Sequence, residues 1–322
     1  MKLLITGGSG FIGLNIIEYY LRLGVDILNI DIQKPRITSH LPYWHNCDIR
    51  DRDSLSKVIN EYKPTHILNL AARTDMYGKT INDYDSNTKG TKNLIELISE
   101  MDFEKVIITS SQFVCRPGKV PEFDEDYEPH TLYGLSKVVS ECVVRSSSLN
   151  RWIIIRPTNI WGPWHPRYPY EFWAILAKGL YIQPSGRSPI RSYGYVKNII
   201  YQIDYLLKSP LEKVQGKTYY VGESSIELIE WVNAFSLALS GREARIVPRS
   251  FVKGLALVGD LFNAMNINFP IQTQRFRSMT EDYLIPESQL VNNIKLPYSL
   301  NEGVKETVNW MYEMGFIHKV YV

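Results

Sequence analysis

The stretch Thr6-Gly7-Gly8-Ser9-Gly10-Phe11-Ile12-Gly13 decides the fold of the first part of this 322-residue chain. It follows the apolar run Leu3–Thr6 and precedes a helical pattern that reaches Leu23. Glycines at positions 7, 10 and 13 permit a tight turn, let the backbone approach a pyrophosphate, and allow the helix to pack closely on the strand. The helix N-terminus offers free N–H groups and a positive dipole end to phosphates. The stretch therefore predicts a strand–turn–helix unit that binds a dinucleotide.

An acidic residue ends the next strand-like run, Asp26–Asp31. Asp31 lies about twenty residues beyond the glycines, where an acid holds the ribose hydroxyls of adenosine. Its charge would repel a 2′-phosphate, so Asp31 favours NAD over NADP, although the nearby Lys34 and Arg36 weaken that preference. The structural alternative is a glycine-dependent turn beside a solvated aspartate.

Strand and helix patterns alternate along the first half of the chain. Short apolar strands separated by helices predict a parallel sheet that is covered on both faces. The expected fold class is therefore α/β, with a doubly wound Rossmann-type parallel sheet. The further strand-like runs are His45–Ile49, His66–Ala71, Val106–Ser110 and Trp152–Arg156, and the helical runs are Asp53–Glu61, Asn87–Glu100 and Tyr133–Leu149.

The pattern changes after Pro163. Prolines and aromatic residues crowd positions 163–173, and mixed helices follow with short strands at Lys217–Val221 and Ala244–Val247. A last helix is expected from a capping box at Ser299–Glu302 to a stop at Gly315. We expect residues 1–163 to form the NAD-binding domain and residues 164–322 a smaller substrate-binding lobe, with a segment near 190–208 returning to the first domain.

The composition is that of a soluble globular enzyme, with 44% hydrophobic and 22% charged residues. A net charge of +2 gives no reason to expect nucleic acid or a membrane surface as partner. No apolar run approaches the roughly 20 residues that span a bilayer. We interpret Gly254–Phe262 as an amphipathic helix on a core, with membrane contact as the minor alternative. The three widely spaced cysteines show no metal pattern, which favours a cytoplasmic location and no metal site.

Tyr133 and Lys137 are four residues apart, so they share one face of a helix. A free tyrosine, with a pKa of about 10, is a poor base, but a nearby ammonium and the positive nicotinamide would favour its phenolate. Ser111, at the mouth of the strand before this helix, would share the substrate oxygen and stabilise charge there during hydride transfer. These three residues are the predicted catalytic group. An ordinary surface pair is the alternative reading of Tyr133 and Lys137.

Over nearly its full length the chain resembles the extended short-chain dehydrogenases/reductases of the nucleotide-sugar epimerase/dehydratase superfamily. The motifs that carry the resemblance are Thr6–Gly13, Asp48-Ile49, Asn69–Ala72, Asn87–Thr91, Ser110-Ser111, Tyr133–Lys137 and Arg156–Pro163.

The resemblance implies a role for each matching position around the cofactor. Phe11 and Ile12 would lie at the pyrophosphate, whereas Asp48 and Ile49 would flank the adenine. The remaining cofactor-binding positions implied in this way are Ala71, Ala72, Asn87, Ser110 and Pro157.

The second substrate implied by the resemblance is a nucleotide-diphosphate sugar. Asn159 would meet its diphosphate, and Arg191 and Arg275 occupy positions where family members hold the same group, a task that suits the planar guanidinium. Ser192 and Lys197-Asn198 depart from the acidic residues usual after that arginine. Arg73 is a candidate for sugar binding, with a structural ion pair to Asp75 as an equal alternative.

The reaction is narrowed by the residues after Ser111. Dehydratases of this family have an acid–base Asp-Glu pair there, whereas this chain has Gln112-Phe113, which cannot transfer the proton. We therefore expect a 4-epimerase, with a nucleotide-sugar ketoreductase or dehydrogenase next and a hydroxysteroid-type dehydrogenase a distant third. A non-catalytic dinucleotide-binding scaffold is the alternative from another class.

Two further expectations come from the resemblance. Cys115 stands where the family has a tyrosine; some sugar epimerase–reductases use a cysteine near this position as a proton donor, but an inert buried thiol is favoured. A homodimer is expected through the helices Asn87–Glu100 and Tyr133–Leu149.

Overall fold

A computed structural model describes residues 1–265, 267, 269–286, 290 and 293–317. Seven parallel strands form the main sheet in the order β11-β6-β5-β4-β1-β2-β3, which confirms the predicted fold class. The order reverses direction between β1 and β4, and such a switch point is where open α/β sheets bind ligands. The strands are β1 (Lys2–Thr6), β2 (Asp26–Asp31), β3 (Trp44–Asn46), β4 (His66–Asn69), β5 (Lys105–Thr109), β6 (Trp152–Pro157) and β11 (Lys217–Val221).

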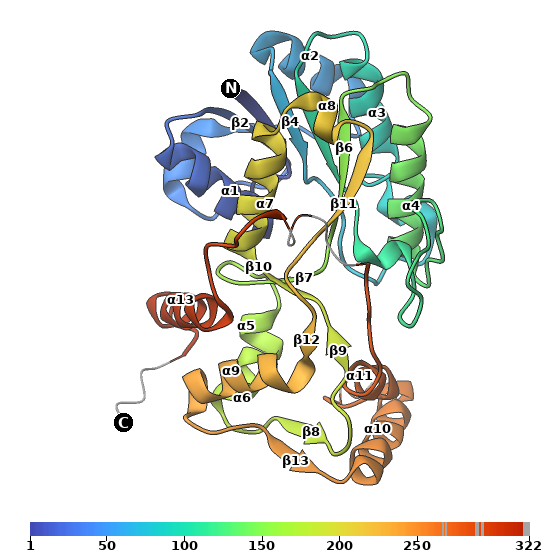
Figure 1. Cartoon of the computed structure of the whole chain (residues 1–322), viewed down its shortest axis with the longest axis vertical. Helices are drawn as coiled ribbons and strands as arrows, with labels where there is room; N and C mark the ends of the chain where they lie inside the picture. Colours follow the sequence, from blue (N-terminus) through green and yellow to red (C-terminus); the bar gives the residue numbers. More distant parts are fainter. Residues whose placement is uncertain (266, 268, 287–289, 291–292, 318–322) are drawn as a thin grey trace.

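Helices cover both faces of this sheet, as Figure 1 shows. On one face lie α1 (Phe11–Arg22) and α7 (Val196–Lys208), whose buried apolar residues belong to a core that continues into the smaller lobe. On the other face lie α2 (Arg52–Tyr62), α3 (Lys89–Ile98) and α4 (Leu132–Arg145), which share a second core with the sheet. Because both faces of the sheet are buried, the strands consist of continuous apolar residues rather than alternating apolar and polar ones.

The smaller lobe joins the sheet by more than one crossing of the chain. Helix α7 packs on α1, where the hydroxyls of Tyr19 and Tyr20 each donate to Asp204 at 3.0 Å. The chain then adds β11 to the sheet, so the returning segment extends to Val221, beyond the predicted residues 190–208. The domain boundary at residue 163 stays a prediction, and residues 318–322 of the predicted lobe lie outside the described residues.

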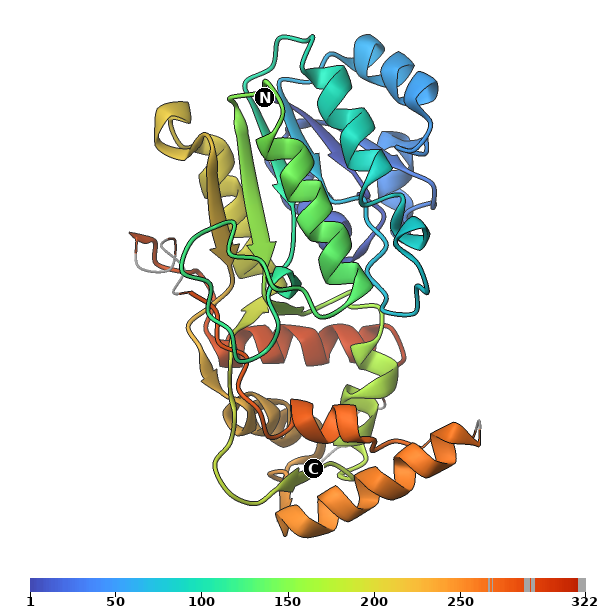
Figure 2. The same cartoon turned by 90° about the vertical axis from the view of Figure 1, so that its right-hand side faces the viewer.

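Short strands and helices build the rest of the lobe (Figure 2). Helix α13 (Leu300–Glu313) crosses between the sheet domain and the outer helices, and its Ser299–Glu302 capping box and the positive φ of Gly315 are both as predicted. Helix α8 (Leu211–Val214) lies instead at the sheet domain, between α7 and β11 (Figure 1). The other elements are α5 (Tyr168–Glu171), α6 (Trp173–Ala177), α9 (Leu228–Ser240), α10 (Arg249–Ala264), α11 (Thr273–Ser278), β7 (Asn159–Trp161), β8 (Ile182–Pro184), β9 (Ile190–Arg191), β10 (Tyr193–Tyr195), β12 (Ile226–Glu227) and β13 (Arg245–Val247).

Several predicted boundaries were wrong by a few residues. The third strand is Trp44–Asn46 rather than His45–Ile49, because the chain turns into α2, where Asp51 caps the first turn. The helix predicted over Tyr133–Leu149 is Leu132–Arg145, because the Thr131 hydroxyl accepts the Gly134 N–H at 3.0 Å and sets its start. No helix in the described part of the chain is long and apolar enough to cross a membrane.

A buried ion pair fixes α4 against the sheet. The Arg156 guanidinium on β6 donates through two nitrogens to the two carboxylate oxygens of Glu141 on α4, each at 2.8 Å. Both side chains are at most 1% exposed. Burial alone would raise the pKa of Glu141, but the hydrogen bonds and charge of Arg156 lower it below its ordinary value. The ionised form of Glu141 is therefore stabilised by Arg156.

Replacing Glu141 with glutamine leaves the Arg156 charge buried without its counterion. Removing one member of a buried pair typically costs 3–5 kcal/mol, so we expect Glu141→Gln to lower the free energy of unfolding by about 3 kcal/mol or more in urea denaturation. Glu281→Gln, which breaks the exposed pair with Arg277, is the matched control and should change it by about 0.5 kcal/mol or less. Equal effects of the two changes would contradict the anchoring role of Glu141.

Candidate active site

The glycine turn lies at the switch point between β1 and β4. Gly7 has φ +72°, and a Cβ atom there would lie 2.6 Å from the backbone N and Cα of Ala71. Only glycine allows the turn and the chain leaving β4 to approach this closely. The Thr6 hydroxyl closes the same junction by donating to Asn69 at 2.5 Å and accepting the Ala71 N–H at 3.2 Å. This backbone cradle fits a dinucleotide pyrophosphate above the start of α1.

Asp31 reaches the glycine turn from the end of β2. Its carboxylate accepts the Ser9 N–H at 3.0 Å and the Gln33 N–H at 2.9 Å. Burial raises the pKa of Asp31 above its ordinary value, while the two N–H groups act in the opposite direction. The carboxylate is thus held beside the cradle, and its remaining acceptor positions suit ribose hydroxyls.

Phe11 and Ile12 begin α1 and pack partly buried against the core shared with the lobe. The ring of Phe11 meets the edge of His165 at a centroid distance of 5.0 Å. One turn further on, the Asn15 amide donates to the Pro163 carbonyl at 3.0 Å. The start of α1 is therefore tied to the proline- and aromatic-rich segment that enters the lobe.

Four other predicted cofactor residues have structural contacts or partial burial of their own. Asp48 pairs with Arg50 at 2.6 Å, and the hydrogen bond from that guanidinium lowers the pKa of Asp48. Ile49 is buried against Gly90 of α3, and Ala71 and Ala72 are partly buried in the loop that follows β4. Contact of these residues with adenine or nicotinamide stays a prediction.

Asn87 is fully buried and links the loop after β4 to α4. Its amide donates to the Arg73 carbonyl at 3.0 Å and to the Ser136 hydroxyl at 2.8 Å, and its oxygen accepts the Arg73 N–H at 2.8 Å. These bonds use both amide protons and one acceptor position of Asn87, so the side chain fixes the loop at Arg73 against α4.

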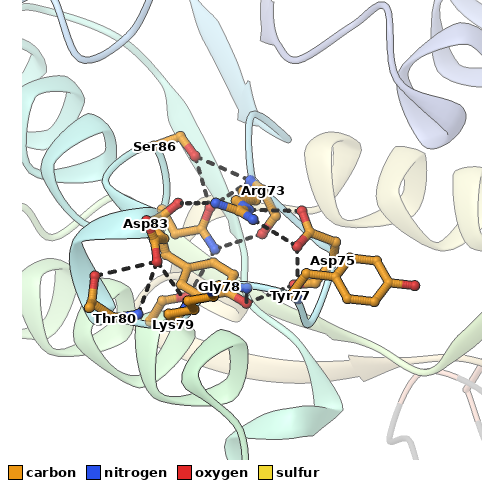
Figure 3. A network of polar contacts seen from close by, with 11 residues as sticks. Arg73, Asp75, Tyr77, Gly78, Lys79, Thr80, Asp83 and Ser86 are labelled. Atoms are coloured by element: carbon orange, nitrogen blue, oxygen red, sulfur yellow. Dashed lines mark hydrogen bonds and ion pairs between the residues drawn. The ribbon is translucent and has the colours of Figure 1, made fainter. Parts of the chain in front are cut away.

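The Arg73 side chain is held within its own loop, as Figure 3 shows. The guanidinium pairs with Asp75 at 2.8 Å and donates to the Asp83 carbonyl at 3.1 Å. Asp83 in turn accepts the N–H groups of Lys79 and Thr80. The structure thus contains the ion pair considered from the sequence, and sugar binding by Arg73 stays a prediction that requires this pair to rearrange.

The three predicted catalytic residues lie together where β5 meets α4. A Cβ at Gly134 would collide with the Phe113 carbonyl oxygen, so glycine allows α4 to approach the turn after Ser111. Tyr133 is buried, and burial raises its pKa, whereas the hydrogen bond with Ser111 and the charge of Arg167 lower it. Ser111 also accepts the Phe113 N–H at 3.2 Å. Tyrosine and serine are thus positioned to share one substrate oxygen.

Lys137 lies one helical turn beyond Tyr133 and is also buried. Its ammonium donates to the Thr109 carbonyl at 2.8 Å. Burial lowers the pKa of Lys137 to about 8, although the Glu141 carboxylate acts to raise it. The charge of this lysine is therefore sensitive to pH in the physiological range.

Ser110 directly follows β5, and Pro157 ends the neighbouring strand β6. The Ser110 hydroxyl donates to Glu141 at 2.5 Å, and Tyr127 donates to the other Glu141 oxygen at 2.9 Å. Pro157 ends β6 and pairs in register with Val221 of β11. Ser110 thus belongs to the buried network that anchors α4, and its contact with the nicotinamide stays a prediction.

Gln112 and Asn159 form an amide pair in the same region. The Gln112 nitrogen donates to the Asn159 oxygen at 3.1 Å, and Asn159 donates to the Ser192 carbonyl at 3.1 Å. Among the described residues, the buried Gln112 oxygen finds no hydrogen-bond partner. This oxygen is available to a donor such as a hydroxyl, and neither amide can serve as an acid or base at neutral pH.

Arg191 and Arg275 are brought together by the lobe. Arg191 donates to the Ser278 carbonyl at 2.6 Å at the end of α11, which carries the exposed Arg275. Both charges act on the partly buried Tyr181, lowering its pKa against a larger rise caused by desolvation. Arg191 thus already has a structural role, and diphosphate binding by either arginine stays a prediction.

Residues that the sequence did not single out complete the surroundings of the site. The charge of the exposed Arg167 lowers the pKa values of Tyr133 and Tyr168, against a larger rise caused by burial. The sequence signals Arg167 only by its place in the aromatic-rich segment. Tyr283 lies much further along the chain, yet its hydroxyl donates to the carbonyls of Gln112 at 3.2 Å and Cys115 at 2.7 Å. No local pattern indicates that contact.

Cys115 is 3% exposed and its thiol contacts the Asp126 carbonyl at 3.3 Å. Burial raises the pKa of this thiol above its ordinary value. The enclosure of the thiol and its contact with the Asp126 carbonyl agree with the inert reading rather than with proton donation to a substrate.

Relatives with assigned activities include enzymes that act on sugar diphosphates. The chain is 28% identical over 214 residues to N-acetyl-alpha-D-glucosaminyl-diphospho-ditrans,octacis-undecaprenol 4-epimerase of Escherichia coli O157:H7, covering 65% of this chain but only 63% of that protein. It is 23% identical to UDP-glucuronate 4-epimerase of Thermodesulfobacterium geofontis, with 96% of each covered. It is also 23% identical to a probable dTDP-glucose 4,6-dehydratase of Sinorhizobium fredii, covering 98% of this chain and 94% of that protein.

Solved structures of epimerases share the fold. UDP-glucose 4-epimerase of Thermotoga maritima with UDP-glucose superposes with a TM-score of 0.73 at 17% identity, over 98% of this chain and 99% of that one. The Thermus thermophilus UDP-glucose 4-epimerase in complex with NAD gives a TM-score of 0.71 at 22% identity, over 99% and 100%.

A family model matches the chain from β1 to the end of β11, the last strand of the main sheet. Residues 3–222 match the model described as the NAD dependent epimerase/dehydratase family. The matched range contains the glycine cradle, Asp31 and the Ser111–Tyr133–Lys137 group, so the NAD cofactor predicted from the sequence agrees with the family. The chain belongs to the NAD-dependent epimerase/dehydratase family.

Proposed function

We propose that this chain is an NAD-dependent 4-epimerase of a nucleotide-diphosphate sugar. The observation that carries the proposal is the intact Ser111–Tyr133–Lys137 group beside the glycine cradle, with the neutral Gln112–Asn159 amide pair next to it. Inversion through a transient keto-sugar needs one proton acceptor, one hydride acceptor and room for the sugar to turn. It needs no additional carboxylic acid.

Each member of the group has a separate task in this reaction. The Tyr133 phenolate accepts the proton of the sugar hydroxyl, and the Ser111 hydroxyl donates a hydrogen bond to the same oxygen. Burial raises the pKa of Tyr133, so formation of the phenolate would depend on the Lys137 ammonium on the same helix face and on the positive nicotinamide of bound NAD. Bound NAD would supply the hydride-accepting and hydride-donating chemistry at the sugar carbon. When the hydride returns to the opposite face of the sugar carbon, Tyr133 gives the proton back to the sugar oxygen, and the inverted hydroxyl is formed.

The substrate contacts are proposed from charge and hydrogen-bonding capacity. Arg191 and Arg275, together with the nearby Arg167, give the lobe side of the site a positive charge suited to a diphosphate. The free Gln112 oxygen would accept a sugar hydroxyl. A cytoplasmic location and a homodimer through α3 and α4 also belong to this proposal.

A nucleotide-sugar ketoreductase is the second candidate. The ketoreductase is favoured by the positive charges of Lys34 and Arg36, which follow Asp31 closely. These charges could bind the 2′-phosphate of NADP, a cofactor that exchanges with solvent. Dehydration is disfavoured because Gln112 and Phe113 lack the required carboxyl groups. The two remaining reactions differ in whether the cofactor is consumed.

The cofactor balance distinguishes these reactions. We expect the purified, denatured chain to release NAD(H), and the native chain to invert a sugar without added cofactor in an NMR screen of UDP-, GDP-, CDP- and dTDP-sugars. Because one relative acts by name on an undecaprenyl diphosphate sugar, a polyprenyl diphosphate sugar belongs in the screen. Stoichiometric consumption of NADH or NADPH with a keto-sugar would instead support the ketoreductase.

Removing the Tyr133 hydroxyl tests the catalytic assignment. Tyr133→Phe takes away the proton acceptor, and such groups typically contribute 10²–10⁴-fold, so we expect kcat to fall by about that factor while the NAD content is unchanged. Tyr62→Phe, which loses a hydroxyl bound to Asp26 away from this site, is the matched control and should retain activity. Unchanged turnover in Tyr133→Phe would favour a non-catalytic scaffold.

The pKa of Lys137 predicts an alkaline limit to activity. The ammonium is the active form and is lost as pH rises through about 8, so kcat/KM should decline above that pH. Lys137→Arg keeps a charge at all accessible pH values and should move the decline upward, even if the maximum rate is lower. A decline at the same pH in Lys137→Arg would assign the limit to another group.

A further inference from the structure

Helix α10 has apolar residues on two separate faces. Val252, Ala256 and Gly259 are buried against the lobe. The other apolar face is exposed, and its positions recur every three or four residues, which places them along one side of the helix. This exposed stripe consists of Phe251 (56% exposed), Leu257 (60%), Val258 (45%), Leu261 (65%) and Met265 (61%), with Gly254 between them.

The position of α10 leaves this stripe open to solvent. The helix lies at the outer end of the lobe, opposite the sheet domain, in both views (Figures 1 and 2). Its inner side packs on α11 and the chain before it: Asp260 accepts the Thr273 N–H at 3.0 Å, and Phe262 stacks on Phe269 at 5.7 Å. The stripe is thus not needed for the attachment of the helix to the lobe.

The surroundings of the stripe are basic. Residues 242–280 contain six arginines and lysines but only two acidic residues, whereas the whole chain has a net charge of only +2. Glu281 and Asp282 follow this range, and Glu281 lies 4.0 Å from Arg277. Lys253 and Arg249 lie on α10 itself and are exposed, and the Arg249 guanidinium also lies over the Phe276 ring of α11 at 5.8 Å. The neighbouring strand β13 adds Ile246, which is 66% exposed. The basic residues are Arg242, Arg245, Arg249, Lys253, Arg275 and Arg277, and the acidic ones are Glu243 and Asp260.

We propose that the exposed stripe of α10 docks on an anionic lipid bilayer surface. An apolar helix face flanked by arginine and lysine is the pattern of helices that lie in the membrane interface, where apolar side chains enter the acyl boundary and cations meet anionic headgroups. A second copy of the chain fits less well, because a two-fold contact through this face brings the same basic surroundings together. Membrane contact, the minor alternative from the sequence, thus becomes the preferred role of this helix.

This docking is independent of the reaction catalysed. It would place α11, and with it Arg275 and the Arg191 contact at Ser278, next to the headgroup layer. The lobe side of the active site would then lie near the bilayer, whereas the glycine cradle in the sheet domain would lie away from it. Loss of docking therefore need not affect turnover of a soluble substrate.

Vesicle flotation of the full chain tests the proposal. We expect it to float with vesicles of equimolar phosphatidylglycerol and phosphatidylcholine, and not with phosphatidylcholine alone. Binding should fall at least about tenfold in Leu257→Glu/Leu261→Glu, and it should weaken in Lys253→Glu and in about 0.5 M salt. Leu23→Glu, the same change at a leucine 52% exposed in the sheet domain, is the matched control and should bind like the wild type.

Three results would overturn the proposal. The first is absence of wild-type binding to the anionic vesicles. The second is equal binding by the wild type and by the double variant whose circular dichroism shows it folded. The third is a wild-type dimer, found by light scattering, that the double variant converts to monomer while neither binds vesicles; the stripe would then be a contact between copies.

Discussion

The close approach of Gly7 to the backbone of Ala71 is the constraint on which the rest of the site depends. It brings the ends of β1 and β4 together at the point where the strand order reverses, so the two loops meet in one cradle. Asp31 bonds to this cradle from the next strand, and Asn87 bonds to the chain beyond Ala71 from the start of α3. A side chain at Gly7 would therefore push the loop after β4 away from the glycine turn.

The reaction centre depends on a second anchor, which acts through α4. Arg156 and Glu141 hold the helix against β6 through a pair that water does not reach, while Gly134 lets its first turn meet the segment after Ser111. Tyr133 and Lys137 gain fixed positions from these two contacts. The same burial that fixes them also shifts their pKa values, so positioning and acid–base behaviour have a common origin.

Local patterns were sufficient to predict the fold class and the glycine turn, but not that β11 joins the main sheet, and the catalytic assignment of Ser111, Tyr133 and Lys137 stays a prediction. Alternating apolar runs and glycine spacing report on contacts between neighbours in sequence, and the motif spacing places Tyr133 and Lys137 on one helix face. The ends of elements were less accurate because caps such as Thr131 depend on a single side-chain hydrogen bond. The contacts of Arg167, Arg191 and Tyr283 could not be predicted, because distant segments create them.

The two carbonyl contacts of Tyr283 have a consequence for how substrate preference can change. A single hydroxyl from the late part of the chain supports the backbone on both sides of Phe113, directly after Ser111. Under the proposed function, exchange of the lobe between related enzymes would change the support of the backbone beside Ser111 as well as the residues proposed to bind the sugar nucleotide. A chimera that retains this tyrosine keeps both carbonyl contacts, whereas one that loses it changes rate and specificity through the same segment.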